Sequence, residues 1–337
     1  MDVIYASDEN YVRHAAASIY TLLRSNAHVP DLTVHFLSLG VTDDSRRKLE
    51  QMIARFGRRL EMHELGDIRS WFGYSVDTGG FAYATLARLF LGRILPESVE
   101  RVLYIDCDTV VLEDLSELFT LDMGKCVAGM VMEPTVNKAR RKQLGLPDSQ
   151  PYDNAGILLI DLKRWRAEGA EQTIIDYFGA HGGKLMAPDQ DALNGALQDR
   201  ILQLPPRYNY GSVQIYYSWK AQRRIAAPTP FMTEDAYRKG TEKPAIIHFL
   251  GEERPWRKGC RHPYTRCYDE ALAATAWAGH PKDEGWTTYF HCFYLFNFLM
   301  KPFPVLRWRI IDGLIPVFMR HRARQLKKKE AAKAPRS

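Results

Sequence analysis

Residues 101–109 constrain the fold of this chain more than any other segment. They read Arg-Val-Leu-Tyr-Ile-Asp-Cys-Asp-Thr, four consecutive apolar residues followed at once by two aspartates one residue apart. A short continuous apolar run is typical of a strand that is buried on both faces of a sheet covered by helices. Open α/β sheets bind their ligands at the carboxyl ends of such strands. The segment therefore predicts an α/β fold with a site at Asp106 and Asp108.

The rest of the first half supports this fold class, because short apolar strands alternate with amphipathic helices. This rhythm predicts a mostly parallel sheet flanked by helices. Asp43 or Asp44 is placed to cap the second helix, and Gly57 to end it. The expected strands are residues 3–6, 32–39, 59–63, 101–105, 125–131, 156–160 and 245–249, and the expected helices include 14–24, 43–56 and 81–91.

The two aspartates themselves point to a divalent cation. Two ionised carboxylates this close would repel each other unless a positive charge lay between them. Carboxylate oxygens suit Mg²⁺ or Mn²⁺, and these ions also bind substrate phosphates. From spacing alone, a solvated Asp-x-Asp turn is the alternative.

Composition limits the compartment and the partners. The 337 residues carry a net charge of +6, but residues 301–337 hold eleven Lys or Arg and two Asp or Glu, a local net charge of +9. The five cysteines lack paired spacing, which favours a reducing compartment, and the amino-terminal residues lack a secretory pattern, so we expect a cytoplasmic protein. Cys260, His262 and Cys267 leave a zinc site open, although no Cys-x-x-Cys element is present.

The last fifty residues differ in character from the rest. Residues 289–300 are strongly aromatic, two prolines follow at 302 and 304, and residues 320–329 are heavily basic. A spanning helix needs roughly 20 uninterrupted apolar residues, so we expect this region to lie on an anionic membrane surface instead. A helical subdomain packed on the core with a solvated tail is the alternative. Basic residues in one tail beside aromatics argue against nucleic-acid binding.

Five further segments join Asp106-Cys107-Asp108 in a recognisable pattern of fixed order. They are Tyr5-Ala6-Ser7-Asp8-Glu9-Asn10, Ala87-Arg88-Leu89, Tyr152-Asp153-Asn154-Ala155-Gly156-Ile157-Leu158-Leu159-Ile160-Asp161-Leu162, Pro188-Asp189-Gln190-Asp191-Ala192-Leu193-Asn194 and His248-Phe249-Leu250-Gly251. With these segments, residues 1–265 resemble the family 8 glycosyltransferases, and among them the bacterial lipopolysaccharide α-galactosyl- and α-glucosyltransferases. The resemblance implies a GT-A (Rossmann-like) α/β fold.

The resemblance assigns the donor and the metal to particular residues. Asp106, Asp108 and His248 match the family's Mn²⁺ ligands, a set that suits Mn²⁺ better than Mg²⁺ because it includes a nitrogen. A purely structural histidine is the alternative for His248. The family's diphosphate-binding lysine is replaced by Arg254, with Lys258 just downstream. The residues expected to bind the UDP-sugar are Ala6, Ser7, Asp8, Asn10, Asp106, Cys107, Asp108, Gly251 and Arg254; without the resemblance, Asp8 and Asn10 indicate an ordinary turn.

Four further residues match positions around the donor sugar: Arg88, Asn154, Asp189 and Gln190. Arg88 lies in an otherwise apolar helix, where a buried ion pair is the structural alternative. An uncharged amide such as that of Gln190 is a poor nucleophile. We therefore expect front-side attack with retention of the anomeric configuration, in which the departing phosphate helps to deprotonate the acceptor.

The sequence thus predicts a Mn²⁺-dependent transferase that moves galactose or glucose from UDP to a lipopolysaccharide or lipooligosaccharide acceptor at the inner face of the cytoplasmic membrane. The expected domains are a catalytic domain at residues 1–265 and a helical, basic, membrane-associating region at 266–337. A glycogenin-like self-glucosylating enzyme and a non-catalytic nucleotide-sugar-binding scaffold are the alternatives.

Overall fold

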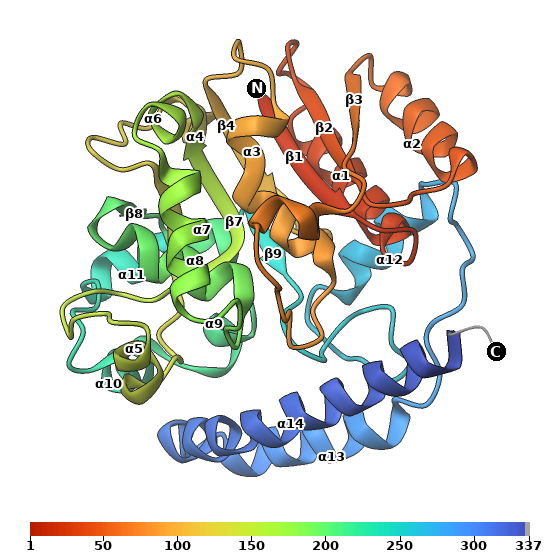
Figure 1. Cartoon of the computed structure of the whole chain (residues 1–337). Helices are drawn as coiled ribbons and strands as arrows, with labels where there is room; N and C mark the ends of the chain where they lie inside the picture. The colour runs from red at the N-terminus through yellow and green to blue at the C-terminus, as the bar shows by residue number, and fades with distance from the viewer. Residues whose placement is uncertain (334–337) are drawn as a thin grey trace.

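The computed structural model describes residues 1–333, with side chains through residue 318 and that of Arg320. A seven-stranded sheet lies at its centre, in the order β3-β2-β1-β4-β7-β6-β8 (Figure 1). Parallel pairs join β1 to β2 and β4, β2 to β3, and β6 to β8, whereas β7 runs antiparallel to β4 and β6. The mostly parallel α/β sheet is therefore confirmed. The strands are β1 (Asp2–Ser7), β2 (Thr33–Ser38), β3 (Arg59–Glu64), β4 (Arg101–Ile105), β6 (Ala128–Met132), β7 (Asp153–Asp161) and β8 (Ile201–Gln203).

Helices cover both faces of the sheet, so β4 is buried on both sides as its apolar run predicted. Val102 and Tyr104 belong to one buried cluster, and Leu103 and Ile105 to the other. The helices of the body are α1 (Val12–Ser25), α2 (Asp43–Arg55), α3 (Leu91–Ile94), α4 (Ser116–Thr120), α5 (Lys138–Gln143), α6 (Leu162–Ala167), α7 (Ala170–Ala180), α8 (Pro188–Leu197), α9 (Ser212–Tyr216), α10 (Trp219–Ala226), α11 (Glu234–Thr241) and α12 (Thr265–Ala273).

The antiparallel direction of β7 matters most for the site. Ile105 pairs with Ile157, and the Asp106 amide donates to the Gly156 carbonyl at 2.8 Å. As a result, the amino end of β7 lies beside the carboxyl end of β4. The residues that begin β7 and the residues that follow β4 therefore lie at the same edge of the sheet.

Three local expectations differ from the structure. The helix expected at 81–91 is a 3₁₀ helix at Tyr83–Phe90, which continues into α3. Thr42, not Asp43 or Asp44, caps α2, because its side chain accepts from the Ser45 amide and the two aspartates lie in the first turn. Finally, β9 (Ile246–His248) does not join the main sheet; it pairs antiparallel with β5 (Thr109–Val111).

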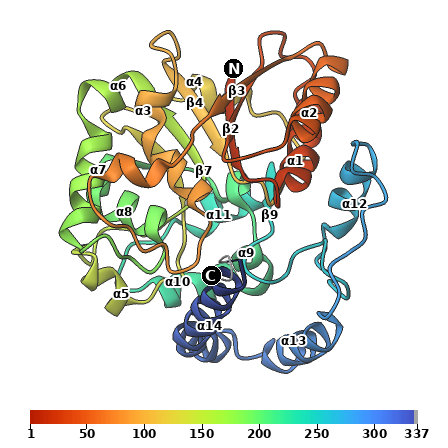
Figure 2. The ribbon, with the colours of Figure 1, turned by 45° about the vertical axis from the view of Figure 1, so that its right-hand side comes forward.

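Two long helices, α13 (Thr287–Met300) and α14 (Pro304–Lys333), lie together along one side of the molecule (Figures 1 and 2). They are anchored to the body by polar contacts: the Arg307 guanidinium donates to the Tyr217 hydroxyl at 2.5 Å, and the Trp308 indole donates to the Thr135 carbonyl at 2.8 Å. Within the described residues, neither helix is long and apolar enough to cross a bilayer. The basic side chains expected at 321–329 lie outside the described side chains.

Candidate active site

Asp106, Asp108 and His248 converge at the carboxyl end of β4. The residue after Asp108 begins β5, and Thr109 pairs with His248 of β9, so the small sheet brings the histidine to the aspartates. Nε2 of His248 lies 3.2 Å from Oδ1 of Asp108 and 3.8 Å from Oδ2 of Asp106. One ligand atom from each residue lies within 4.8 Å of the others. The three residues are therefore spaced to hold one cation.

A hydrogen-bond chain orients the ring of His248. Its Nδ1 lies 2.9 Å from Oδ1 of Asn209, whose own amide nitrogen donates to Oδ1 of Asn154 at 2.8 Å. Because the amide oxygen can only accept, Nδ1 carries a proton, and in the neutral ring Nε2 presents its lone pair to the aspartates. Metal-ligating histidines are held in this way by a partner on the other ring nitrogen. The donor set consequently fits a divalent cation such as Mn²⁺.

The electrostatics of the pocket favour a positive charge. Burial raises the pKa of Asp106, Arg88 opposes this rise, and the neighbouring Asp108 adds to it. Burial alone would lower the pKa of His248, but the attraction of Asp108 and Asp106 raises it overall. A proton or a metal ion between the carboxylates relieves their repulsion.

Arg88 is buried and joins two carboxylates. Its Nη2 donates to Oδ1 of Asp106 at 2.6 Å, and its Nε lies 3.1 Å from Oδ2 of Asp189. A third bond runs from Nη1 to the Ala155 carbonyl, and the guanidinium lies 4.3 Å from the centre of the Tyr104 ring. The charge expected in an apolar helix is thus compensated by ion pairs, and it fixes Asp189 relative to the paired aspartates.

Asn154, Asp189 and Gln190 lie where β7 and α8 begin. Gln190 accepts from the Ala155 amide at 3.0 Å and donates to the Tyr152 hydroxyl at 3.1 Å, so both ends of its amide are held. Asn154 accepts from the Gly156 amide at 2.9 Å. Burial raises the pKa of Asp189, and Arg88 counters that effect. These three residues, which were predicted together with Arg88 to surround the donor sugar, lie at the same edge of the sheet as the paired aspartates. Their catalytic roles stay predictions.

The turn after β1 is built by Asp8. One of its oxygens accepts from the amides of Asn10 and Tyr11 at 3.0 and 3.2 Å, and the other accepts from the Asn10 side chain at 3.2 Å. The bonds expected of an ordinary turn are therefore present. Cys107 links this turn to the metal strand, since its thiol donates to the Ala6 carbonyl at 3.3 Å. Ser7 is buried next to it, with its hydroxyl donating to the Asp8 carbonyl.

The two candidate phosphate-binding cations lie in different surroundings. Nη2 of Arg254 lies 3.1 Å from Oδ2 of Asp108, and its Nε donates to the Gly251 carbonyl at 2.8 Å. Gly251 has a φ of +69°, a backbone conformation that side-chain-bearing residues rarely adopt. Lys258 instead pairs with Glu284 at 2.9 Å. Arg254 is therefore the one at the paired aspartates.

Two residues that sequence reasoning assigned no role of their own complete the site. Asn209 lies in a segment without clear periodicity, so nothing in the sequence indicated that it orients His248. Gly156 belongs to the family motif, but its packing is a finding: a Cβ there would lie 2.1 Å from Cε1 of His248. The cysteine site left open at Cys260, His262 and Cys267 is not among the metal-capable clusters of the described residues.

Similarity to known proteins agrees with this geometry. Residues 2–260 match the model of glycosyl transferase family 8. The chain is 30% identical over 280 residues to general stress protein A of Bacillus subtilis, covering 82% of this chain and 94% of that protein. It is 26% identical over 280 residues to the lipopolysaccharide 1,2-glucosyltransferase of Escherichia coli K12, covering 82% and 79%.

Among solved structures, the galactosyltransferase LgtC in complex with donor and acceptor sugar analogues superimposes with a TM-score of 0.70 at 22% identity, covering 86% of this chain and 99% of that one. The sheet order, the helices on both faces and the paired aspartates at the end of β4 thus define a protein of the GT-A fold. The chain belongs to glycosyl transferase family 8, which confirms the resemblance found in the sequence. It is a glycosyltransferase.

Proposed function

We propose that this enzyme transfers galactose or glucose from a UDP-sugar, with retention of configuration and with Mn²⁺, to a lipopolysaccharide or lipooligosaccharide acceptor. The observation that carries the proposal is the convergence of Asp106, Asp108 and His248 with Arg254 at one edge of the sheet. Two carboxylates, an oriented imidazole and an adjacent guanidinium are the groups that a metal-bound diphosphate requires. Lipopolysaccharide is the substrate named for the E. coli relative.

Different residues would bind the metal, the diphosphate and the nucleoside of the donor. Asp106, Asp108 and His248 would hold Mn²⁺, which when bound supplies charge neutralisation for the leaving UDP. Arg254 would add a bidentate contact to the same phosphates. The turn at Ser7, Asp8 and Asn10 would bind the nucleoside.

Arg88 holds Asp189 in place, where it would accept hydrogen bonds from the sugar hydroxyls, and Gln190 is held by its bond to β7, where it would lie near the anomeric carbon. Because both ends of the Gln190 amide are engaged, it is poorly suited to act as a nucleophile. This favours front-side attack, with the departing phosphate accepting the acceptor's proton.

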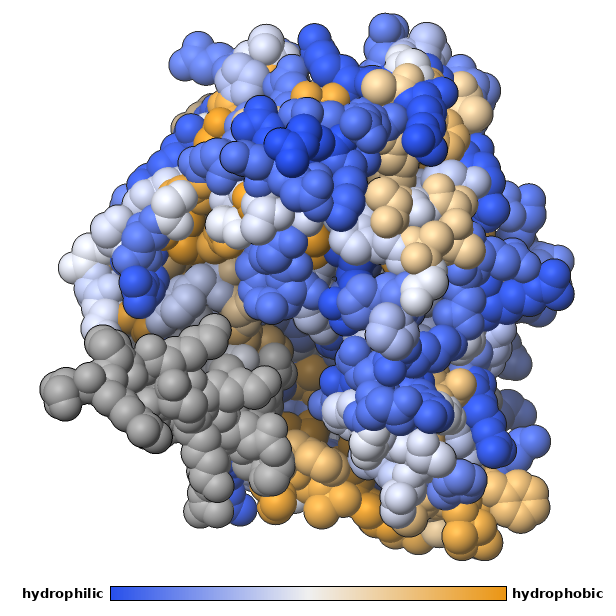
Figure 3. Space-filling model, turned by 90° about the vertical axis from the view of Figure 1, so that its right-hand side faces the viewer, coloured by the Kyte–Doolittle hydropathy of each residue, from blue (hydrophilic) through white to orange (hydrophobic). Residues whose placement is uncertain are grey.

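The acceptor proposal is supported by an apolar surface at α13 and α14. Of the ten large hydrophobic side chains that are exposed in the described part of the chain, nine lie in these helices and the turn between them. Figure 3 shows them gathered along the lower edge of the molecule. In Figure 1, β1 runs from the amino terminus toward this same side, so the carboxyl ends of β1 and of the parallel strand β4 face α13 and α14. Such a surface suits an interfacial position on a membrane, so we infer that the enzyme works on glycolipid at the inner face of the cytoplasmic membrane.

Release of UDP from UDP-galactose and UDP-glucose tests the proposal. We expect hydrolysis that depends on Mn²⁺ and stops with a chelator. The rate of UDP release should fall by about 100-fold or more in the Asp108→Asn variant, because metal assistance lowers the activation free energy by several kcal/mol. Asp148→Asn is the matched control, since Asp148 is exposed and pairs only at the surface with Lys138.

Two outcomes would contradict the proposal. If neither UDP-sugar is bound or turned over with Mn²⁺, the donor is wrong. If mass spectrometry detects a covalent sugar on Gln190 or Asp189, the front-side mechanism is wrong.

A further inference from the structure

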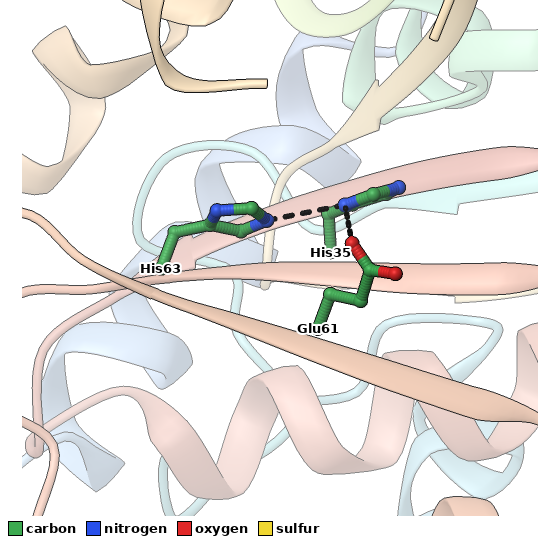
Figure 4. A group of neighbouring side chains, drawn as sticks. All are labelled: His35, Glu61 and His63. Atoms are coloured by element: carbon green, nitrogen blue, oxygen red, sulfur yellow. Dashed lines mark hydrogen bonds and ion pairs between the residues drawn. The ribbon is translucent and has the colours of Figure 1, made fainter. Parts of the chain in front are cut away.

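A second cluster of metal-ligating side chains lies away from the active site, on the edge of the sheet. It comprises His35 of β2 with Glu61 and His63 of β3, and Figure 4 shows the three side chains gathered together, with dashed lines from one ring nitrogen of His35 to each of the other two. His35 is directly opposite Glu61 in the parallel register, and His63 is two residues further along the same strand. No residue of this cluster takes part in the proposed transfer reaction.

The distances in the cluster match those of a metal shell. Nδ1 of His35 lies 3.1 Å from Nε2 of His63 and 3.5 Å from Oε2 of Glu61. Four ligands at tetrahedral angles around Zn²⁺, each about 2.0–2.1 Å from the metal, lie roughly 3.3 Å from one another. Two histidines and a glutamate are also a known zinc donor set, which leaves the fourth position to water.

Asp2 fixes which nitrogen of His35 faces the cluster. Nε2 of His35 lies 3.0 Å from Oδ1 of Asp2. An ionised carboxylate only accepts, so Nε2 carries a proton, and in the neutral ring Nδ1 presents a lone pair. That lone pair faces the carboxylate of Glu61, and two electron-rich atoms at this distance repel unless a proton or a metal ion lies between them. A hydrogen bond from His63 to Nδ1 does not relieve the contact with Glu61.

We propose that His35, Glu61 and His63 bind a Zn²⁺ ion, with Asp2 as the carboxylate that orients His35. Carboxylate–histidine–metal arrangements of this kind are typical of zinc sites. The ion has a way in, because the Glu61 and Asp2 side chains are about one-third exposed, at 34% and 30%. A metal here ties the edge strand β3 to β2, and through Asp2 to β1, so it stabilises this side of the nucleotide-binding half of the sheet.

Zinc titration by calorimetry tests the proposal, on the full chain and in an Asp108→Asn background that weakens metal binding at the active site. In the Asp108→Asn background we expect one Zn²⁺ per chain and a higher melting temperature with Zn²⁺. His63→Ala should lower the affinity by more than about 100-fold, and Asp2→Asn by about 10- to 100-fold, the usual loss when an outer-shell partner is removed. His291→Ala is the control, because His291 is an exposed histidine on α13.

The variants separate metal binding from folding. His63 is only partly buried on an edge strand, so His63→Ala should keep the circular dichroism of the parent without zinc. Co²⁺ gives a second readout, since a tetrahedral centre should absorb in the visible region in the parent and lose that absorption in His63→Ala. Equal Zn²⁺ affinity and equal Co²⁺ spectra in His63→Ala and His291→Ala would overturn the proposal.

Discussion

At the scale of single residues, the tightest constraint at the proposed metal site is between Gly156 and the ring of His248. A Cβ at position 156 would meet Cε1 of that ring at 2.1 Å, and the ring cannot turn away without losing its bond to Asn209. We therefore expect Gly156→Ala to lower the affinity for Mn²⁺ by at least about tenfold, measured as the Mn²⁺ concentration needed for UDP release. The variant should also lose about 1–3 kcal/mol of folding stability. Gly313→Ala is the control, because nothing lies within 4 Å of its added Cβ. A normal Mn²⁺ titration in Gly156→Ala would contradict this account.

The same residues mark how far the sequence alone could predict the site. Asp106, Asp108 and His248 were predicted as one group because the family motifs keep their order, and the structure brings them together. Asn209 was not predicted, since its role depends on where an irregular segment crosses the amino end of β7. Distances between side chains from such distant segments follow from tertiary packing, which local residue patterns do not encode.

At the scale of elements, β7 carries a buried carboxyl group whose ionisation opposes folding. Burial raises the pKa of Asp153 from 3.8 to about 7, and the bonds donated by Gln203 counter only part of this. The folded chain thus holds this proton more tightly than the unfolded chain. Asp153 should therefore make stability fall as pH rises from about 4 to about 7, by up to roughly 4 kcal/mol.

Asp153→Asn, which imitates the neutral acid, should remove that part of the decline. Melting temperatures measured between pH 4 and 8 would check this, with Asp148→Asn as the exposed control. If the two variants show the same pH profile, Asp153 is ionised without penalty in the folded protein.

The elements also differ in how well periodicity predicts them. Continuous apolar runs identified β1 and β4, because burial on both faces demands them, and alternation identified β2. The direction of β7 and the separate pairing of β9 with β5 depend on connections between distant segments. Alternation in the sequence does not indicate strand direction. The antiparallel direction of β7 nevertheless decides that Asn154 lies at the same edge of the sheet as Asp106.

At the scale of the whole molecule, the two C-terminal helices combine a buried anchor with an exposed apolar face. Arg307 is buried and bonds to Tyr217 of the body and to Asn297 of α13. Deleting the chain after Pro302 would therefore remove a structural contact as well as the apolar face. We expect the truncated protein to lose membrane binding. That loss has two explanations, removal of the apolar face and destabilisation of the fold, which the truncation does not distinguish.

A triple variant separates the two effects. Phe298→Ser, Leu299→Ser and Phe303→Ser change side chains that are 74%, 57% and 57% exposed, so the melting temperature should stay at the parent value. Sedimentation with anionic vesicles should fall by at least about tenfold, because burial of each large apolar side chain contributes about 1.5–3 kcal/mol. Met186→Ser, which removes the one exposed large hydrophobic residue of the described part of the chain that lies outside the two helices and the turn between them, should bind vesicles as the parent does. If the triple variant and Met186→Ser sediment equally, the apolar face does not bind the membrane.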